Sequence, residues 1–171
     1  MEMNFCRRCS AKLTQTQEYA FQCASGHLIF ANSPAATGMM FINDKKQVLV
    51  IRRAIDPGKG KIDMGGGFCD GGETAEACLL REVQEELGLS PADYDPPKFL
   101  LSCIDSYEFK GEVVPVLSLI FWTHIKPNAH ITVADDVAAA EFASFEAIDS
   151  RDIQFESFAK SLEVLRDRGV I

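Results

Sequence analysis

Apolar residues cluster in runs that are typical of β-strands over much of the chain. We predict strands over residues 36–43, 47–53, 98–109 and 112–125. The first two are joined like a hairpin across residues 44–46. We expect the fourth strand to be long and largely buried, with Pro115 marking an edge or a bulge. The pattern over residues 135–148 is ambiguous.

Helical periodicity is present in two segments. From about Thr74 to Leu87, apolar residues recur at i, i+3 and i+7, and Gly88 is a suitable stop. The residues of this apolar arc are Leu80, Val83 and Leu87. Residues 153–168 predict an amphipathic helix, whose apolar side carries Phe155, Phe158, Leu162 and Leu165. The mixed order of strands and helices predicts an α/β or α+β domain around a mixed sheet.

Residues 1–33 differ from the rest, because they hold too little apolar material for a hydrophobic core. They contain Cys6-x2-Cys9, then thirteen residues, then Cys23-x3-His27, a spacing that fits tetrahedral zinc ligation. A redox Cys-x-x-Cys would need a βαβ unit, which this segment lacks. We therefore divide the chain into a zinc-ribbon-like segment, 1–33, and a larger domain, 34–171.

Composition narrows the classes of function. Apolar residues make up 47% of the 171 residues and charged residues 25%, an ordinary soluble mix. The net charge of −8 disfavours nucleic acid as a partner, but it allows anionic substrates if a metal ion reverses the local sign. The first residues show no secretory signal, and VVPVLSLIFW (113–122) is too short to cross a bilayer. We expect a cytoplasmic protein without a membrane partner, with its cysteines as thiols or metal ligands.

Three carboxylates crowd one arc of the first helix. Glu82, Glu85 and Glu86 lie beside the predicted buried arc rather than opposite to it, and like charges at this spacing repel. One alternative is a solvated charged face. The other is a divalent ion such as Mg²⁺, which prefers carboxylate, water and phosphate oxygens. The glycine-rich loop MGGGFCDGGE (64–73) directly before the helix favours the ion, because glycines let the backbone approach closely.

These residues resemble the Nudix box. Gly67, five residues, Glu73, seven residues and then REVQEELGL (81–89) match every fixed position of that pattern. Family members often have Trp-x-Leu-Pro before the paired glycines, whereas this chain has Ile62-Asp63-Met64-Gly65, which puts the rigidity of the loop in doubt. The resemblance implies an α/β/α sandwich with a mixed sheet. It also implies hydrolysis of a nucleoside diphosphate linked to another moiety, with Mg²⁺ or Mn²⁺ as cofactor.

The resemblance also implies roles for single residues. Glu82 and Glu86 would be metal ligands, and Glu85 would be a third ligand or the base; which glutamate takes the proton stays open. Arg81 would orient a glutamate, and Glu73 would support the site. The Gly66–Gly67 backbone would help to hold the metal. For the additional acid that many relatives carry before the last helix, Asp136 is the best match, with Asp135 and Glu141 next.

The first segment resembles the zinc ribbon of NADH-pyrophosphatase-like Nudix proteins. Gly26 stands where that ribbon has its fourth cysteine, so His27 is the candidate replacement, beside Cys6, Cys9 and Cys23. The alternative is a degenerate ribbon with spare thiols. For Cys69, Cys78 and Cys103, which have no partners at ligand spacing, we expect small buried or loop residues. The family is commonly homodimeric, so we also expect a homodimer.

The substrate is less defined by the sequence. The Ser-Gln-Pro-Trp-Pro-Phe-Pro signature of NADH pyrophosphatases is absent, which favours ADP-ribose or FAD over NADH or NAD. Arg52, Arg53 and Phe68 are candidate substrate-binding residues, with ordinary surface positions as the alternative for the arginines. For most of the ring-bearing residues Phe68, Tyr107, Phe109 and Trp122, core packing is the favoured role. Two other functions compete: a non-catalytic Nudix regulator, and a Nudix-fold isomerase acting on a prenyl diphosphate; the intact box argues against both.

Overall fold

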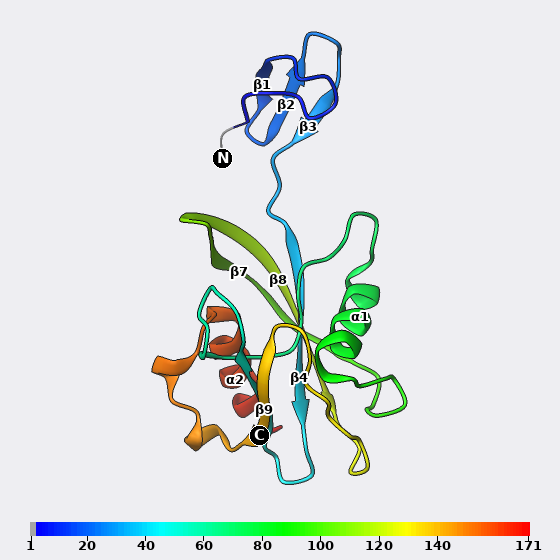
Figure 1. Ribbon diagram of the computed structural model, residues 1–171, viewed down its shortest axis with the longest axis vertical. Coiled ribbons are helices and arrows are strands. Elements are labelled where there is room, and N and C mark those ends of the chain that lie inside the picture. Colours follow the sequence, from blue (N-terminus) through cyan, green and yellow to red (C-terminus); the bar gives the residue numbers. More distant parts are fainter. Residues whose placement is uncertain (1–2) are drawn as a thin grey trace. The chain divides into compact units, whose positions relative to one another are not determined.

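The computed structural model describes residues 3–171, and these fall into two compact units. The first unit ends at Ser33, and the second is Pro34–Ile171 (Figure 1). No helix among residues 3–171 is both long and apolar enough to span a bilayer.

The second unit is built on a six-stranded mixed sheet in the order β6-β5-β4-β8-β7, with β9 beside β5. The strands are β4 (Ala35–Ile42), β5 (Val48–Arg53), β6 (Ile62–Asp63), β7 (Lys98–Phe109), β8 (Glu112–His124) and β9 (Val137–Ala143). The pair β4 and β8 is parallel, and the other pairs are antiparallel. The ambiguous segment is therefore a strand followed by a 3-10 turn at Phe145–Ala147.

The central strand β4 is buried on both faces, because a helix covers each side of the sheet (Figure 1). Met39 and Phe41 pack into the core beneath α1 (Ala75–Leu87). Met40 and Ile42 point the other way, into the core beneath α2 (Glu156–Asp167). This alternation follows from the period of two along a strand. The fold is the expected α/β/α sandwich with a mixed sheet.

Helix α1 begins and ends where the sequence predicts, but its buried face is rotated. The Thr74 Oγ1 accepts from the Ala77 N–H at 3.2 Å, and Gly88 ends the helix in the left-handed region with φ 65°. Leu79, Val83 and Leu87 are buried, whereas Leu80 is 37% exposed. The prediction that Leu80 is buried is therefore wrong. The periodicity allowed either leucine, and contact with β4 selects Leu79.

Helix α2 starts later than predicted. Residues 153 and 154 are extended, because Ile153 forms a parallel bridge to Ile62 and the Gln154 N–H donates to the Ile62 carbonyl at 2.9 Å. The helix therefore begins at Glu156, and Phe155 precedes it. Phe158, Leu162 and Leu165 are buried as expected, but Phe155 is not on the helical face.

The expectation for β8 is only half correct. Its pairing with β4 begins at Leu117, so the first residues of β8 pair with β7 alone. Pro115 lies in that part and is exposed, and Val113 is 67% exposed. A missing N–H is tolerated at such a locally free edge. The strand is buried only from Val116 onward, in alternation.

The first unit is a small three-stranded antiparallel sheet. Its strands are β1 (Leu13–Gln17), β2 (Ala20–Cys23) and β3 (Leu28–Phe30). A small cluster forms its interior, made of Cys6, Leu13, Phe21, Cys23, Ile29 and Ala31. Two cysteines belong to this cluster, so the thiols take part in the interior of the unit.

Candidate active site

The glycine loop is fastened to the central strand by its backbone. The Thr37 N–H donates to the Gly67 carbonyl and the Met39 N–H to the Gly65 carbonyl, each at 2.9 Å. Gly66 has a φ of 147°, and a Cβ there would lie 2.0 Å from the carbonyl oxygen of Thr37. Only glycine fits this close approach of two backbones. The loop is thus fastened to β4 through its backbone, although this chain lacks the tryptophan and proline of the Nudix pattern.

The loop backbone reaches the glutamates of α1. The Gly66 N–H donates to Oε2 of Glu86 at 2.7 Å. A Cβ at Gly67 would lie 2.6 Å from the carboxyl carbon of Glu82, so a side chain there would displace the Glu82 carboxylate. The loop and the carboxylates therefore form one continuous polar surface.

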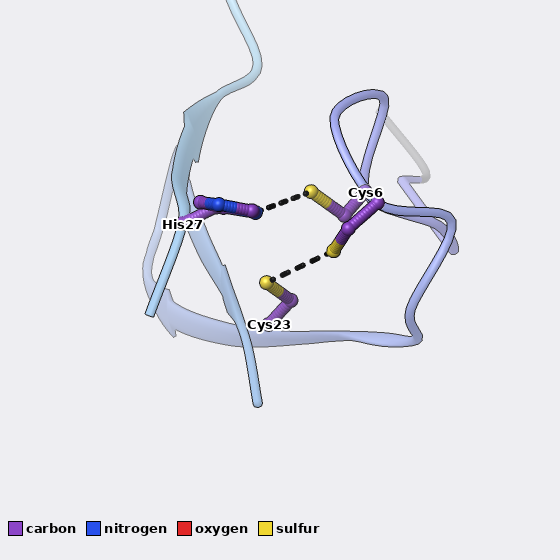
Figure 2. A group of neighbouring side chains, drawn as sticks. Cys6, Cys23 and His27 are labelled. Carbon is purple, nitrogen blue, oxygen red and sulfur yellow. Dashed lines mark hydrogen bonds between the residues drawn. The ribbon is translucent and has the colours of Figure 1, made fainter. Parts of the chain in front are cut away.

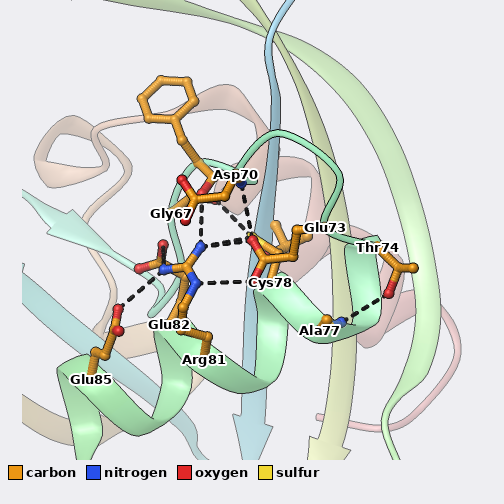
Figure 3. Close-up of polar contacts among 11 residues, drawn as sticks. Gly67, Asp70, Glu73, Thr74, Ala77, Cys78, Arg81, Glu82 and Glu85 are labelled. Carbon is orange, nitrogen blue, oxygen red and sulfur yellow. Dashed lines mark hydrogen bonds and ion pairs between the residues drawn. The ribbon is translucent and has the colours of Figure 1, made fainter.

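Arg81 bridges three of the acids (Figure 3). Its Nε and Nη2 atoms bind both carboxylate oxygens of Glu73, at 3.0 and 2.9 Å. Its Nη1 lies 2.6 Å from Glu82 Oε1 and 3.1 Å from Glu85 Oε2. A fork of guanidinium donors suits this arrangement better than a lysine would. The Arg81 guanidinium lowers the pKa of Glu73 to about 2, with the Asp70 N–H as the next cause.

Glu86 has no such partner among residues 3–171 and is the most buried acid of the group, at 5% exposure. Burial raises the pKa of Glu86 to about 8, the Gly66 N–H opposes this shift, and Glu82 adds to it. Burial also raises the pKa of Glu82, against the effect of Arg81. Carboxylates that resist ionisation together are stabilised in their charged form by a cation. Their oxygens and the Gly67 carbonyl are the hard donors that Mg²⁺ and Mn²⁺ prefer, so this donor set fits the implied metal.

A distant loop adds two further acids. The Thr132 and Ala134 N–H groups donate to the carbonyls of Leu87 and Glu86, at 2.9 and 3.0 Å, which fastens the loop to the end of α1. Both Asp135 and Asp136 then line the same cleft as Glu82, Glu85 and Glu86. Glu141 lies instead in β9, paired with Val50. The structure thus brings Asp136 and Asp135 to the site and leaves Glu141 outside it.

The cleft has a volume of about 380 Å³. Arg53 and Phe68 line it, whereas Arg52 is outside it and donates to the Gly60 carbonyl at 3.2 Å. The Arg53 guanidinium is already engaged, with Nη1 at 2.9 Å from Asp63 Oδ2 and Nε at 2.7 Å from the Pro57 carbonyl. Burial raises the pKa of Asp63 to about 6, while Arg53 lowers it.

Sequence reasoning missed several residues that line the cleft, among them Asp63, Asp105 and Phe155. Asp63 stands between two glycine-containing loops, and Asp105 shares its strand with Glu108, so the sequence offered no signal that singled out either acid. Phe155 was assigned to a helix face, so nothing in the periodicity pointed to the cleft.

In the first unit the four predicted zinc ligands meet. The Cys6 Sγ lies 3.6 Å from the His27 Nδ1, and the Cys9 Sγ lies 3.7 Å from the Cys23 Sγ (Figure 2). All four ligand atoms lie within 4.8 Å of one another, and the cysteines are free thiols. Sulfur atoms about 3.8 Å apart are what tetrahedral Zn–S bonds of about 2.3 Å produce. Gly26, with φ 79°, forms the left-handed turn that brings His27 to the cluster in place of a fourth cysteine.

Cys69, Cys78 and Cys103 do not form such a group. Cys78 is buried and accepts from the Thr37 hydroxyl at 3.2 Å, and burial raises the pKa of its thiol to about 12. Cys69 and Cys103 are half-buried. Cys78 is thus a small buried residue and Cys69 a loop residue, as expected, whereas Cys103 lies in strand β7.

The comparison with known proteins agrees with this geometry. The model of the NUDIX domain matches residues 32–163. An ADP-ribose pyrophosphatase of Methanocaldococcus jannaschii is 29% identical over 127 residues, which are 74% of this chain and 72% of that protein. A human mitochondrial NAD(P)H pyrophosphatase is 36% identical over 67 residues, 39% of this chain but only 19% of that longer protein.

Solved structures show the same fold. A NUDIX hydrolase from Nitrosomonas europaea superposes with a TM-score of 0.69 at 18% identity, covering 97% of this chain and 92% of that chain. The NUDIX domain of Shewanella oneidensis NrtR in complex with ADP ribose has a TM-score of 0.66 at 16% identity, covering 81% of this chain and 90% of that chain. The family match over most of the chain, the α/β/α sandwich and the complete box together show that the chain belongs to the Nudix family of pyrophosphohydrolases.

Proposed function

We propose that the protein hydrolyses the pyrophosphate bond of a nucleoside diphosphate linked to another moiety, with ADP-ribose or FAD as substrate and AMP as a product. One observation carries the proposal: five carboxylates from α1 and a distant loop converge in one cleft with the backbone of a glycine loop. Such a surface repels a phosphate unless divalent cations are present. The similarity to an archaeal ADP-ribose pyrophosphatase supports this substrate class.

The ligand set for Mg²⁺ or Mn²⁺ comprises Glu82, Glu85, Glu86, Asp136 and the Gly67 carbonyl. When bound, the metal neutralises charge on the diphosphate and lowers the pKa of a water molecule. The Gly66 N–H holds the carboxylate of Glu86 in one orientation. Among residues 3–171, the Gly67 carbonyl accepts the Thr37 N–H and a long contact of 3.7 Å from the Cys78 thiol, so its second lone pair is only weakly engaged.

The remaining residues of the box accept a proton or orient the carboxylates. Glu85 has the most exposed side chain of the three glutamates on Arg81, at 50%, so it can accept a proton and release it to solvent. Glu82 is the other candidate base, since burial already raises its pKa. Arg81 orients Glu82 and Glu85, and Glu73 fixes Arg81 through two parallel hydrogen bonds.

The first unit is proposed to bind one structural Zn²⁺ through Cys6, Cys9, Cys23 and His27. The converging ligand atoms and the free thiols support this site. A unit with so small an interior gains stability from a metal, because the bound ion ties the two ligand pairs together. A homodimer and a cytoplasmic location stay predictions, which size-exclusion chromatography with light scattering and cell fractionation test.

The second candidate is an NAD(P)H or NAD pyrophosphatase, which the similarity to the human mitochondrial enzyme supports. One screen distinguishes the two. The full chain is incubated with ADP-ribose, FAD, NADH and NAD, each with Mg²⁺ or Mn²⁺, and AMP release is measured by chromatography. We expect the highest kcat/KM for ADP-ribose or FAD. A clear preference for NADH selects the second candidate, and no turnover of any substrate leaves the non-catalytic regulator.

A further inference from the structure

Part of the cleft is aromatic rather than acidic. The rings of Tyr107 and Phe155 are nearly parallel, with centroids 5.9 Å apart and planes at 13°. Phe68 packs edge-on against Tyr107 at 5.2 Å. All three residues line the cleft, and both Tyr107 and Phe155 are only half-buried. Their rings therefore present apolar surface to the cleft instead of filling the core.

The rings of Phe68, Tyr107 and Phe155 form an aromatic wall, which is held in place before any ligand binds. The Arg53 guanidinium carbon lies 5.3 Å from the centroid of the Phe155 ring, and Arg53 is itself fixed by Asp63. The chain around Phe155 is fixed on both sides, by the hydrogen bond from Gln154 to Ile62 and by the start of α2. A wall that is already ordered loses little conformational entropy on binding, which suits it to a flat ligand.

Asp105 lies on the floor of the same cleft and is 5% exposed. Its Oδ2 accepts from the Ser118 hydroxyl at 2.6 Å, and its Oδ1 accepts from the Ser157 N–H at 2.9 Å. Within residues 3–171 it forms no ion pair. A carboxylate offers about four acceptor positions, so about two are left for a ligand. A buried acceptor of this kind is stabilised by a donor and repels another acceptor.

We propose that Tyr107, Phe155 and Asp105 form the base subsite of this cleft, which selects a purine carrying an exocyclic amine, such as adenine. The proposal rests on the proposed function, because it names the base of the substrate cleaved beside it. The purine stacks on the aromatic wall, and its amino group donates to Asp105. A 6-oxo purine would place an acceptor oxygen against the carboxylate, and a site built around a hydrogen bond rejects the analogue that cannot form it.

The test measures binding of AMP and IMP to the full chain by isothermal titration calorimetry with Mg²⁺. Neither nucleotide has a pyrophosphate bond, so no turnover interferes. The wild-type protein is expected to bind AMP about tenfold more tightly than IMP. Tyr107→Leu and Phe155→Leu are each expected to weaken the binding of both nucleotides about tenfold, without changing the ratio of the AMP and IMP affinities. Phe109→Leu is the matched control, since Phe109 lies on the same strand but outside the cleft and is 56% exposed.

Asp105→Asn separates recognition from structure. The asparagine carbonyl can still accept from Ser157, and its amide can donate to the Ser118 hydroxyl, so the fold is kept while an acceptor becomes a donor. The preference for AMP is expected to disappear or reverse in favour of IMP. Equal affinity of the wild-type protein for AMP and IMP overturns the role of Asp105 even if this variant does not fold. If both leucine variants bind AMP and IMP with unchanged affinity, the purine does not stack on Tyr107 and Phe155.

The two proposals fail separately. If the protein hydrolyses ADP-ribose while the wall and floor variants bind AMP normally, the subsite is wrong and the proposed function stands. If no diphosphate is hydrolysed but AMP is preferred through Asp105, the proposed function is wrong and the subsite stands.

Discussion

The backbone N–H of Gly66 donates a 2.7 Å hydrogen bond to the Glu86 carboxylate, a contact that links the glycine loop to α1. Glu86 is buried and lacks the arginine that binds Glu73, Glu82 and Glu85. The acid that most needs a counter-charge is therefore held by a neutral donor. This arrangement leaves its second oxygen for a cation.

Glu86→Gln is expected to reduce kcat for AMP release by at least about a thousandfold, because an amide cannot supply the negative charge of a metal ligand. The fold should persist, since the glutamine carbonyl can still accept from Gly66. Turnover by chromatography and far-UV circular dichroism check this expectation. Glu163→Gln, at an exposed position of α2, serves as control and should behave like the wild type. Retained activity in Glu86→Gln would show that the metal is bound elsewhere.

Gly66→Ala is expected to lower the free energy of unfolding by about 3 kcal/mol, since the new methyl group meets the Thr37 carbonyl in a strained region of φ. If the loop moves instead, activity should be lost at nearly unchanged stability. Urea denaturation and turnover together distinguish these outcomes. Gly71→Ala is the matched control, because a Cβ at Gly71 has no atom within 4 Å. Equal behaviour of the two variants would contradict the close approach.

Arg81→Lys is expected to reduce kcat at least about tenfold, because a lysine cannot bind Glu73 through two parallel bonds and also reach Glu82 and Glu85. The change should affect kcat more than KM, since Arg81 orients the carboxylates rather than the substrate. Steady-state kinetics measure the difference. The control, Arg166→Lys on the exposed side of α2, should leave both constants unchanged. An effect on KM alone would assign Arg81 to substrate binding.

Asp136→Asn and Asp135→Asn identify the additional acid. We expect Asp136→Asn to lower kcat at least about tenfold and to raise the Mg²⁺ concentration needed for half-maximal rate, because a ligand charge is removed. Asp135→Asn should have the smaller effect. Glu141→Gln should have none, since Glu141 lies in β9 outside the cleft. Titration of the rate with Mg²⁺ ranks the effects of the three substitutions. A larger effect of Asp135→Asn than of Asp136→Asn would make Asp135 the additional metal ligand.

Stability should depend on pH through Asp63. Because burial raises the folded-state pKa of Asp63 from 3.8 to about 6, its contribution to stability is complete below about pH 4 and is lost as the pH rises through 6. Relative to Asp63→Asn, the wild-type protein should therefore lose about 2–3 kcal/mol between pH 4 and pH 7. Denaturation curves at both pH values, without divalent metal, measure this difference. A constant difference between the two proteins would mean that Asp63 titrates normally.

The zinc content of the protein tests whether the first unit binds zinc. Freshly purified wild-type protein, prepared without chelator, should contain about one zinc ion per chain by elemental analysis. Cys23→Ser should remove most of it, and His27→Ala should weaken retention against a mild chelator. Cys103→Ser, outside the cluster, should keep the full content. A zinc content near zero in the wild type would indicate a degenerate ribbon.

Much of the fold and of the Nudix box could be predicted from the sequence, because interactions between residues close in sequence determine those features. The helix over about residues 74–87, its stop at Gly88 and the spacing of Glu82, Glu85 and Glu86 depend on residues within one or two turns of each other. The grouping of Cys6, Cys9, Cys23 and His27 followed from ligand spacing alone.

Only the tertiary structure decided features that depend on distant segments. Whether Leu79 or Leu80 is buried depends on contact with β4, and the start of α2 depends on a bridge between residues 62 and 153. Likewise Asp105 and Phe155 meet in the cleft because a sheet and a helix bring together positions that no periodicity relates. The hydrophobic pattern of the sequence predicts which face of a single helix or strand is buried, whereas a cleft is formed by the packing of several elements.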